Sequence, residues 1–115
     1  SGSHFLSAYT GKMVKKTVLY LNEHVKDVIL RWKLADYVHI SEDYLSRIFK
    51  KEMALTPWDY IIRLRIHISK ILLKETSEQI AEIAEKVGFS DQAYFCRVFK
   101  KIVGISPLAF RKKHE

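Results

Sequence analysis

The 115-residue sequence has little of what cross-linked, membrane-spanning or β-rich proteins require. Its single cysteine, Cys96, excludes an intrachain disulfide framework and is typical of a reducing cytoplasm. No apolar run approaches the roughly 20 residues that cross a bilayer, and no secretory signal pattern is visible. Glycine and proline are scarce, and no stretch alternates like a strand for long. These absences predict an all-α, cytoplasmic chain with no membrane partner.

Acidic residues are too few to balance the basic ones. The chain carries 20 Lys+Arg against 13 Asp+Glu, a formal net charge of +7, and its pI is near 9.5. This balance favours an anionic partner, either nucleic acid or a membrane surface, although a merely soluble basic protein has the same balance. With 48% hydrophobic residues, the chain is long enough for one ordinary domain or two very small lobes.

The sequence contains an internal repeat. The segment Phe49–Pro57 corresponds to Phe99–Pro107, and upstream of it Tyr44–Ile48 corresponds to Tyr94–Val98. Further upstream the offset between the copies is one residue shorter, which places a one-residue insertion between Ser90 and Tyr94. Two copies are too few for a solenoid. Two similar helical lobes on a basic chain suggest a bipartite DNA-binding protein.

Helix signals divide the chain into about seven helices. Ser41 is a candidate N-cap, and Thr56 with Asp59 forms a candidate capping box. Thr76 or Ser77 is expected to open the fifth helix, and Gly88 is expected to follow its end in a left-handed conformation. His39 occupies the equivalent position in the first copy. The expected helices are 12–25, 31–38, 42–53, 57–75, 76–87, 91–103 and a short one from 107.

The long helix expected at 57–75 is apolar around most of its circumference, which predicts burial on more than one side. Its polar residues form a narrow stripe: Asp59, Arg63, His67, Lys70 and Lys74. We therefore expect this helix to join two helix-turn-helix lobes. The expected organisation is a leader at 1–11, in which Ser1–His4 has the composition of an expression remnant, a first lobe at 12–56, the linker helix at 57–75 and a second lobe at 76–115.

The second helix of each helix-turn-helix is expected to lie in a DNA major groove, with its N-terminal part at the base edges. These recognition helices are 42–53 and 91–103. Their apolar faces are Tyr44, Leu45, Ile48 and Phe49, and Tyr94, Phe95, Val98 and Phe99. A single exposed arginine is more often part of a solvated helix face than of a DNA contact, but here the same pattern of residues occurs in both copies of the repeat. The predicted base contacts are Asp43, Ser46, Arg47, Gln92, Ala93, Cys96 and Arg97. The predicted phosphate contacts are Ser41, Lys50, Lys51, Ser90, Lys100 and Lys101.

The sequence resembles the DNA-binding domain of the AraC/XylS family of bacterial transcription regulators from about Lys12 to Lys113. The resemblance rests on Arg65-Ile66, Leu72-Leu73, Ile80, Ile83-Ala84, Val87-Gly88-Phe89, Tyr94-Phe95, Arg97, Phe99-Lys100-Lys101, Gly104, Ser106-Pro107 and Arg111. It implies two lobes joined by a long helix, each with one recognition helix in the major groove. Ser69, Ala54 and Asp43 depart from the family pattern.

The resemblance also implies the partners of the chain. These are double-stranded DNA at an operator or promoter, RNA polymerase, and a sensing or dimerising domain in the full-length protein. No such domain is visible in the 115 residues, so the chain resembles an output domain or a small stand-alone regulator.

Other functions are disfavoured by the residues. His4, His24, His39, His67 and His114 show no metal-ligand spacing with each other or with Cys96, and no glycine-rich phosphate loop occurs. We therefore expect neither an enzyme nor a cofactor. A helical protein-interaction module that binds an acidic partner remains the alternative function. Among the aromatic residues, Trp32, Tyr37 and Tyr60 are expected to be partly buried.

Overall fold

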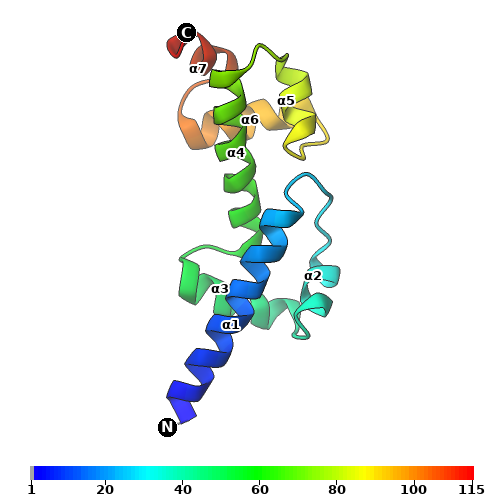
Figure 1. Cartoon of the computed structure of the whole chain (residues 1–115), viewed down its shortest axis with the longest axis vertical. Coiled ribbons are helices and arrows are strands. Elements are labelled where there is room, and N and C mark those ends of the chain that lie inside the picture. The colour runs from blue at the N-terminus through cyan, green and yellow to red at the C-terminus, as the bar shows by residue number, and fades with distance from the viewer. Residues whose placement is uncertain (1) are drawn as a thin grey trace. The chain divides into compact units, whose positions relative to one another are not determined.

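The structure, a computed structural model, describes the backbone of residues 2–115 and the side chains of residues 8–115. That part of the chain forms seven helices and no strand (Figure 1), which confirms the predicted all-α fold. Ser1 and the side chains of 2–7, on which much of the expected leader falls, lie outside the described residues. The helices are α1 (Gly2–Glu23), α2 (Arg31–Tyr37), α3 (Glu42–Met53), α4 (Pro57–Glu75), α5 (Ile80–Lys86), α6 (Gln92–Val103) and α7 (Pro107–Lys113).

The chain divides into two compact units. Unit 1 contains Ser1–His24 and Val28–Ile61, and unit 2 contains Val25–Asp27 and Ile62–Glu115. Helices α1, α2 and α3 belong to unit 1, whereas α5, α6 and α7 belong to unit 2. Helix α4 begins in unit 1, and from Ile62 onward it belongs to unit 2. Among the described helices, none has the length and apolar character that a membrane crossing requires.

Unit 1 is built around a helix-turn-helix formed by α2 and α3. Leu34 of α2 and Leu45 and Phe49 of α3 are completely buried. The hydroxyl oxygen of Ser41 accepts a hydrogen bond from the amide of Tyr44 (3.2 Å), which confirms the predicted N-cap of α3. The other buried apolar residues of this unit are Val14, Leu21, Ala35, Val38, Ile48 and Ile61.

Unit 2 repeats this arrangement with α5 and α6, and its core is rich in phenylalanine. Ring centroids lie 5.2 Å apart between Phe89 and Phe95, 5.8 Å apart between Phe95 and Phe99, and 5.6 Å apart between Phe99 and Phe110. These tilted and edge-on contacts suit aromatic rings better than stacked faces. The buried aliphatic residues around them are Ile66, Leu73, Ile83, Ala84 and Val87.

The turns of the two units share an unusual backbone. His39 (φ 60°) and Gly88 (φ 100°) follow the first helix of each helix-turn-helix, as predicted. Ala54 (φ 67°) and Gly104 (φ 99°) follow the second helix, so Ala54 adopts the left-handed conformation without being glycine. The repeat seen in the sequence is therefore a repeat of backbone geometry, including positions where the residue type differs.

Two helix starts differ from the prediction by several residues, and the other boundaries agree within two residues. Helix α1 begins at Gly2, ten residues before the expected start at Lys12, because no proline precedes position 57 and one glycine at Gly11 weakens a helix by only about 1 kcal/mol. Helix α5 begins at Ile80, so neither Thr76 nor Ser77 opens it. The Thr76 hydroxyl instead donates to the carbonyl of Leu72 (2.7 Å), and the Thr76 amide also bonds to that carbonyl (3.0 Å). Thr76 thus ends α4.

The start of α4 agrees with the prediction. The Thr56 hydroxyl oxygen accepts from the Asp59 amide (3.2 Å), and the same hydroxyl donates to the Asp59 carboxylate (3.0 Å). Pro57 follows at the first helical position, where its missing N–H costs nothing.

Burial of the aromatic residues was predicted with mixed success. Tyr60 is partly buried, and its hydroxyl donates to the Asn22 side chain (2.9 Å). Trp32 is 63% exposed, so the prediction was wrong for it. Tyr37 is also exposed, because α2 turns Leu34 and Ala35 inward and leaves the flanking positions outside.

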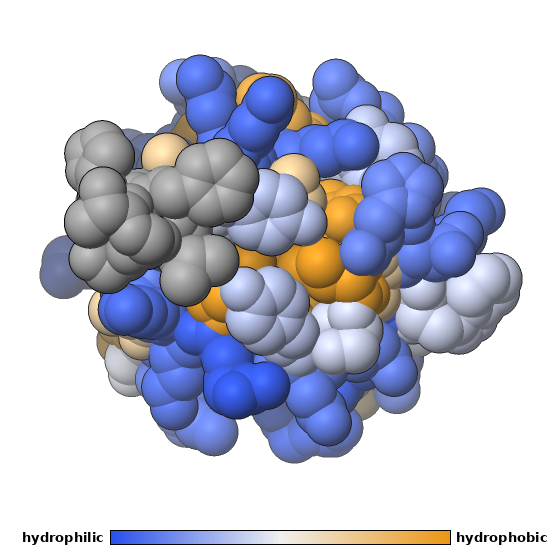
Figure 2. Space-filling model, turned by 90° about the horizontal axis from the view of Figure 1, so that it is seen from below, coloured by the Kyte–Doolittle hydropathy of each residue, from blue (hydrophilic) through white to orange (hydrophobic). Residues whose placement is uncertain are grey.

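Seen from below, the surface carries apolar and weakly polar side chains surrounded by hydrophilic ones (Figure 2).

Candidate nucleic-acid interface

Helix α3 separates apolar from polar residues as the sequence predicted. Leu45, Ile48 and Phe49 are buried, whereas Asp43, Arg47, Lys50 and Lys51 are exposed. Ser46 and Tyr44 are half-buried. The guanidinium carbon of Arg47 lies 5.8 Å from the centroid of the Tyr44 ring, within the range of a cation–π contact. The exposed side of α3 is therefore basic, with the two carboxylates of Glu42 and Asp43 at its N-terminal end.

Helix α6 presents the same arrangement. Phe95 and Phe99 are buried, and Cys96 and Val98 are half-buried. Its exposed residues are Gln92, Ala93, Arg97, Lys100 and Lys101. The guanidinium carbon of Arg97 lies 5.8 Å from the Tyr94 ring centroid, the same separation as in α3. The two units therefore hold an arginine in the same local setting, three residues after a tyrosine.

The sequence predicts that Tyr94 faces inward, whereas 43% of this residue is exposed in the structure. Its ring contacts Phe89 edge-on with centroids 5.7 Å apart, which leaves the rest of the ring at the surface beside Arg97. A tyrosine at this position serves as a support for the arginine as much as a core residue.

The N-termini of the two helices are capped by different residues. In α6 the Asp91 carboxylate accepts from the amides of Ala93 (2.8 Å) and Tyr94 (3.5 Å), so Asp91 is the N-cap and the helix begins at Gln92. Ser90, the counterpart of the Ser41 cap in sequence, is exposed and precedes the cap. The extra residue of the second copy is therefore accommodated just before α6. Ser41 and Ser90 as phosphate contacts stay predictions.

The basic residues of both outward faces are not engaged in ion pairs. The structure of the described residues shows an ion pair between Lys86 and Glu78 (2.7 Å), but none for Arg47, Arg97 or the lysines at 50, 51, 100 and 101. Their charges are available to an external anion.

Burial raises the pKa of the Cys96 thiol, which keeps it protonated and argues against a nucleophilic role for this cysteine.

Arg65 packs against Gly88 in the turn between α5 and α6, a role that the sequence did not predict. It is buried, and its Nε and Nη2 atoms donate to the carbonyls of Val25 (2.8 Å) and Asp27 (2.7 Å). Burial lowers the pKa of Arg65, and the nearby Asp27 and Tyr94 partly offset this effect. A Cβ atom on Gly88 would lie 2.6 Å from the Val25 carbonyl oxygen and 2.8 Å from Arg65 Nε. The turn before α6 therefore fits tightly against this arginine.

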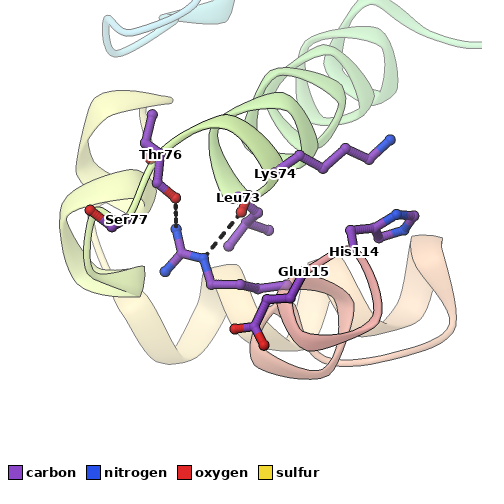
Figure 3. A pocket seen from close by; sticks show the side chains of 7 residues that line it. Leu73, Lys74, Thr76, Ser77, His114 and Glu115 are labelled. Atoms are coloured by element: carbon purple, nitrogen blue, oxygen red, sulfur yellow. Dashed lines mark hydrogen bonds between the residues drawn. The ribbon is translucent and has the colours of Figure 1, made fainter.

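Arg111 has a similar role at the other end of unit 2. Its guanidinium donates to the carbonyls of Leu73 (3.1 Å), Thr76 (3.1 Å) and Glu78 (2.6 Å), and it lines a pocket together with Lys74 and His114 (Figure 3). These bonds tie the segment between α4 and α5 to α7. Sequence spacing gives no signal for such contacts, because donor and acceptor are more than thirty residues apart.

No cluster of three or more histidine, cysteine, aspartate or glutamate side chains with a geometry suited to a metal ion occurs among the side chains that the structure describes. Apart from the carboxylates in the first turn of α3, the charged residues on the outward faces of α3 and α6 are arginines and lysines, a chemistry suited to binding phosphates and base edges.

Comparison with known proteins identifies the family. The sequence profile described as "Helix-turn-helix domain" matches residues 34–113. The uncharacterized HTH-type transcriptional regulator YisR of Bacillus subtilis is 40% identical over 93 residues, which are 81% of this chain and 32% of YisR. The arabinose operon regulatory protein of Escherichia coli is 35% identical over 99 residues, 85% of this chain and 34% of that protein. The chain thus spans about a third of the length of these relatives.

Solved structures agree. The C-terminal domain of AraT, a response regulator from Geobacillus stearothermophilus, has a TM-score of 0.84 at 31% identity, with 88% of this chain and 84% of that chain covered. The DNA-binding domain of AdpA, solved in complex with a target DNA, shares the fold with a TM-score of 0.83 at 23% identity, covering 88% and 91% of the two chains. By its profile, its relatives and its fold, the chain belongs to the AraC/XylS family of helix-turn-helix domains.

Proposed function

We propose that this chain binds double-stranded DNA sequence-specifically, as the output domain of a bacterial transcription regulator. Helices α3 and α6 are the recognition helices, and they enter two successive major grooves. The observation that carries the proposal is the repeated setting of Arg47 and Arg97, each exposed and each 5.8 Å from the ring of the tyrosine three residues earlier. An arginine so placed can donate two parallel hydrogen bonds to guanine O6 and N7.

The neighbouring residues divide by their position along each helix. Those near the N-terminal end are assigned to base edges: Asp43, Ser46 and Arg47 on α3, and Gln92, Ala93, Cys96 and Arg97 on α6. The lysines a turn later and the serines before each helix are assigned to phosphates: Ser41, Lys50, Lys51, Ser90, Lys100 and Lys101. Exposure supports most of these assignments; Ser46 and Cys96 are half-buried and offer less surface to a base.

The relatives support the same function. AdpA, whose DNA-binding domain has this fold, was solved in complex with a target DNA, and the arabinose operon protein is described as regulatory. Because this chain spans about a third of such relatives, we further propose that it works in the cytoplasm with a sensing or dimerising domain and with RNA polymerase. We assign it no catalytic activity and no cofactor, since the relatives are transcriptional regulators.

The test is a titration of labelled random duplex DNA at several salt concentrations. Release of counterions from several phosphates gives a log–log slope of about −0.9 for each neutralised phosphate, so we expect a steep fall in affinity with salt. The double variant Lys100→Ala/Lys101→Ala should reduce that slope by about two. The matched control Lys12→Ala/Lys15→Ala removes two exposed lysines of α1 and should leave the slope unchanged.

Absence of DNA binding would overturn the proposal, as would salt-independent binding. Either result would favour a helical module that binds an acidic protein partner.

A further inference from the structure

Within unit 2, a row of basic residues follows one face of α4, and none of them is among the proposed DNA contacts. They are spaced by four, three and four positions, so they share one helix face along about 16 Å. We call these residues the α4 basic row: Arg63, His67, Lys70 and Lys74. Three of them are exposed, and Lys70 is half-buried. These four are the basic members of the polar stripe predicted for this helix, whose remaining member, Asp59, lies one turn before Arg63 and belongs to unit 1.

The row continues onto α7. The ammonium groups of Lys70 and Lys74 lie 5.8 and 5.6 Å from the centroid of the Phe110 ring, and the His114 ring centroid lies 4.3 Å from it. Reduced access to water and the positive charges of Lys74, Lys113 and Lys70 lower the pKa of His114. In the part of the chain with described side chains, no carboxylate pairs with the row. Positive charge is thus concentrated here without an internal partner.

The row borders a hollow with an apolar floor. A cavity of about 300 Å³ lies between α4 and the C-terminal end of α6. Its apolar floor is formed by the half-buried Ile102 and Val103 beside the buried Ile66, and Arg63, His67 and Lys70 form its basic rim. An apolar floor with a charged rim suits a ligand that has both an apolar side chain and negative charges.

The hollow and Arg97 are on different sides of α6. Ile102 is on the inward side of α6, three residues after the buried Phe99, and Phe110 contacts Phe99 while carrying Lys70 and Lys74 on its other side. A duplex that is engaged by Arg97 on the outward face of α6 therefore leaves the row uncovered.

We propose that the α4 basic row and its hollow bind an acidic segment of a partner protein, with one bulky apolar side chain of that segment in the hollow. Charge complementarity selects an anionic partner, and the apolar floor selects a peptide over a phosphate chain, which has no apolar side chain to place there. This surface goes beyond the proposed DNA contacts and would let the chain hold a protein while it holds DNA.

The test uses a fluorescein-labelled poly-glutamate peptide with one central leucine, and the same peptide with serine in its place. Binding to the whole chain is followed by fluorescence anisotropy. We expect the leucine peptide to bind more tightly and to shift the methyl signals of Ile102 and Val103 in NMR spectra. Lys70→Gln/Lys74→Gln should weaken the leucine peptide about tenfold, because it removes two favourable charge contacts.

The control is Lys100→Gln/Lys101→Gln, measured with both the peptide and duplex DNA. The proposal predicts opposite patterns: the α4 variant loses peptide affinity and keeps DNA affinity, whereas the α6 variant does the reverse. Equal weakening of the peptide by both variants, equal affinity of the two peptides, or loss of DNA affinity in the α4 variant would overturn it. Because DNA binding is recorded separately, failure of the DNA proposal would be recognised on its own.

Discussion

Four of the arginine residues serve two different purposes, and the location of each guanidinium decides which. Arg65 and Arg111 donate to backbone carbonyls inside unit 2 and hold irregular segments in place. Arg47 and Arg97 lie on exposed helix faces with no ion pair among the described residues. Because the guanidinium groups of Arg65 and Arg111 are held against backbone carbonyls, only the second of these two pairs is available for base recognition.

The distinction between base and phosphate contact can be measured on α6. Arg97→Ala should cost about 1–3 kcal/mol of binding free energy on the preferred duplex and relax preference at one or two base pairs. Lys101→Ala should weaken binding evenly across sequences and lower the salt slope by about one. Both variants are titrated with preferred and scrambled duplexes at two salt concentrations. Equal losses on both duplexes for Arg97→Ala would reassign it to phosphate contact.

A second residue-level prediction concerns Gly88, and Gly104 is its matched control. Both have φ near +100°, so an alanine at either position pays a left-handed strain of about 1–2 kcal/mol. At Gly88 the new Cβ would also lie 2.6 Å from the Val25 carbonyl oxygen, whereas nothing lies within 4 Å at Gly104. Urea unfolding should therefore show a larger loss of stability for Gly88→Ala than for Gly104→Ala. Equal losses would mean that the contact with the Val25 segment contributes nothing.

At the level of elements, local capping made most of the helices predictable. Ser41, Thr56 and Gly88 each act at the boundary where the sequence placed them. Helix α3 has the predicted bounds, and the exposed face of α6 contains the predicted Gln92, Ala93 and Arg97 because apolar periodicity assigns the opposite face to the core.

Several of the failures involve partners that are distant in sequence. Thr76 reads as an N-cap, yet its carbonyl is bound by Arg111, 35 residues away, and its hydroxyl returns to α4. The exposure of Trp32 depends on which face of α2 packs inward, and the role of Arg65 depends on the carbonyl of Val25, 40 residues away. Local patterns carry no information on such contacts.

Helix α4 is the element whose continuity matters most, because it begins in unit 1 and the rest of it belongs to unit 2. Ile66 is 1% exposed in its interior. Ile66→Pro removes a helix hydrogen bond and should cost roughly 3 kcal/mol or more of stability, together with DNA affinity, although no base contact changes. Ile66→Val is the control, since it keeps the helix and should cost only about 0.5–1.5 kcal/mol. The measurements are thermal unfolding and duplex titration; wild-type folding and affinity in Ile66→Pro would refute a structural role for α4 continuity.

For the molecule as a whole, the repeat has kept its geometry and changed its recognition residues. Both units retain the tyrosine–arginine pair, but α3 places Asp43 and Ser46 beside its arginine, and α6 places Gln92 and Cys96 beside its own. Two identical faces would read a repeated element. Two different faces should read two unlike elements, because the donor and acceptor groups that meet the bases differ.

The proposed DNA binding requires the two recognition helices to read one face of a duplex in successive major grooves. This is tested by selecting the sequences that the monomeric chain binds from a random duplex pool. We expect a site of two unlike short elements about one helical turn apart, centre to centre, with Arg47→Ala relaxing one element and Arg97→Ala the other. A site with a single short element, a perfect palindrome, or no enriched sequence would contradict it.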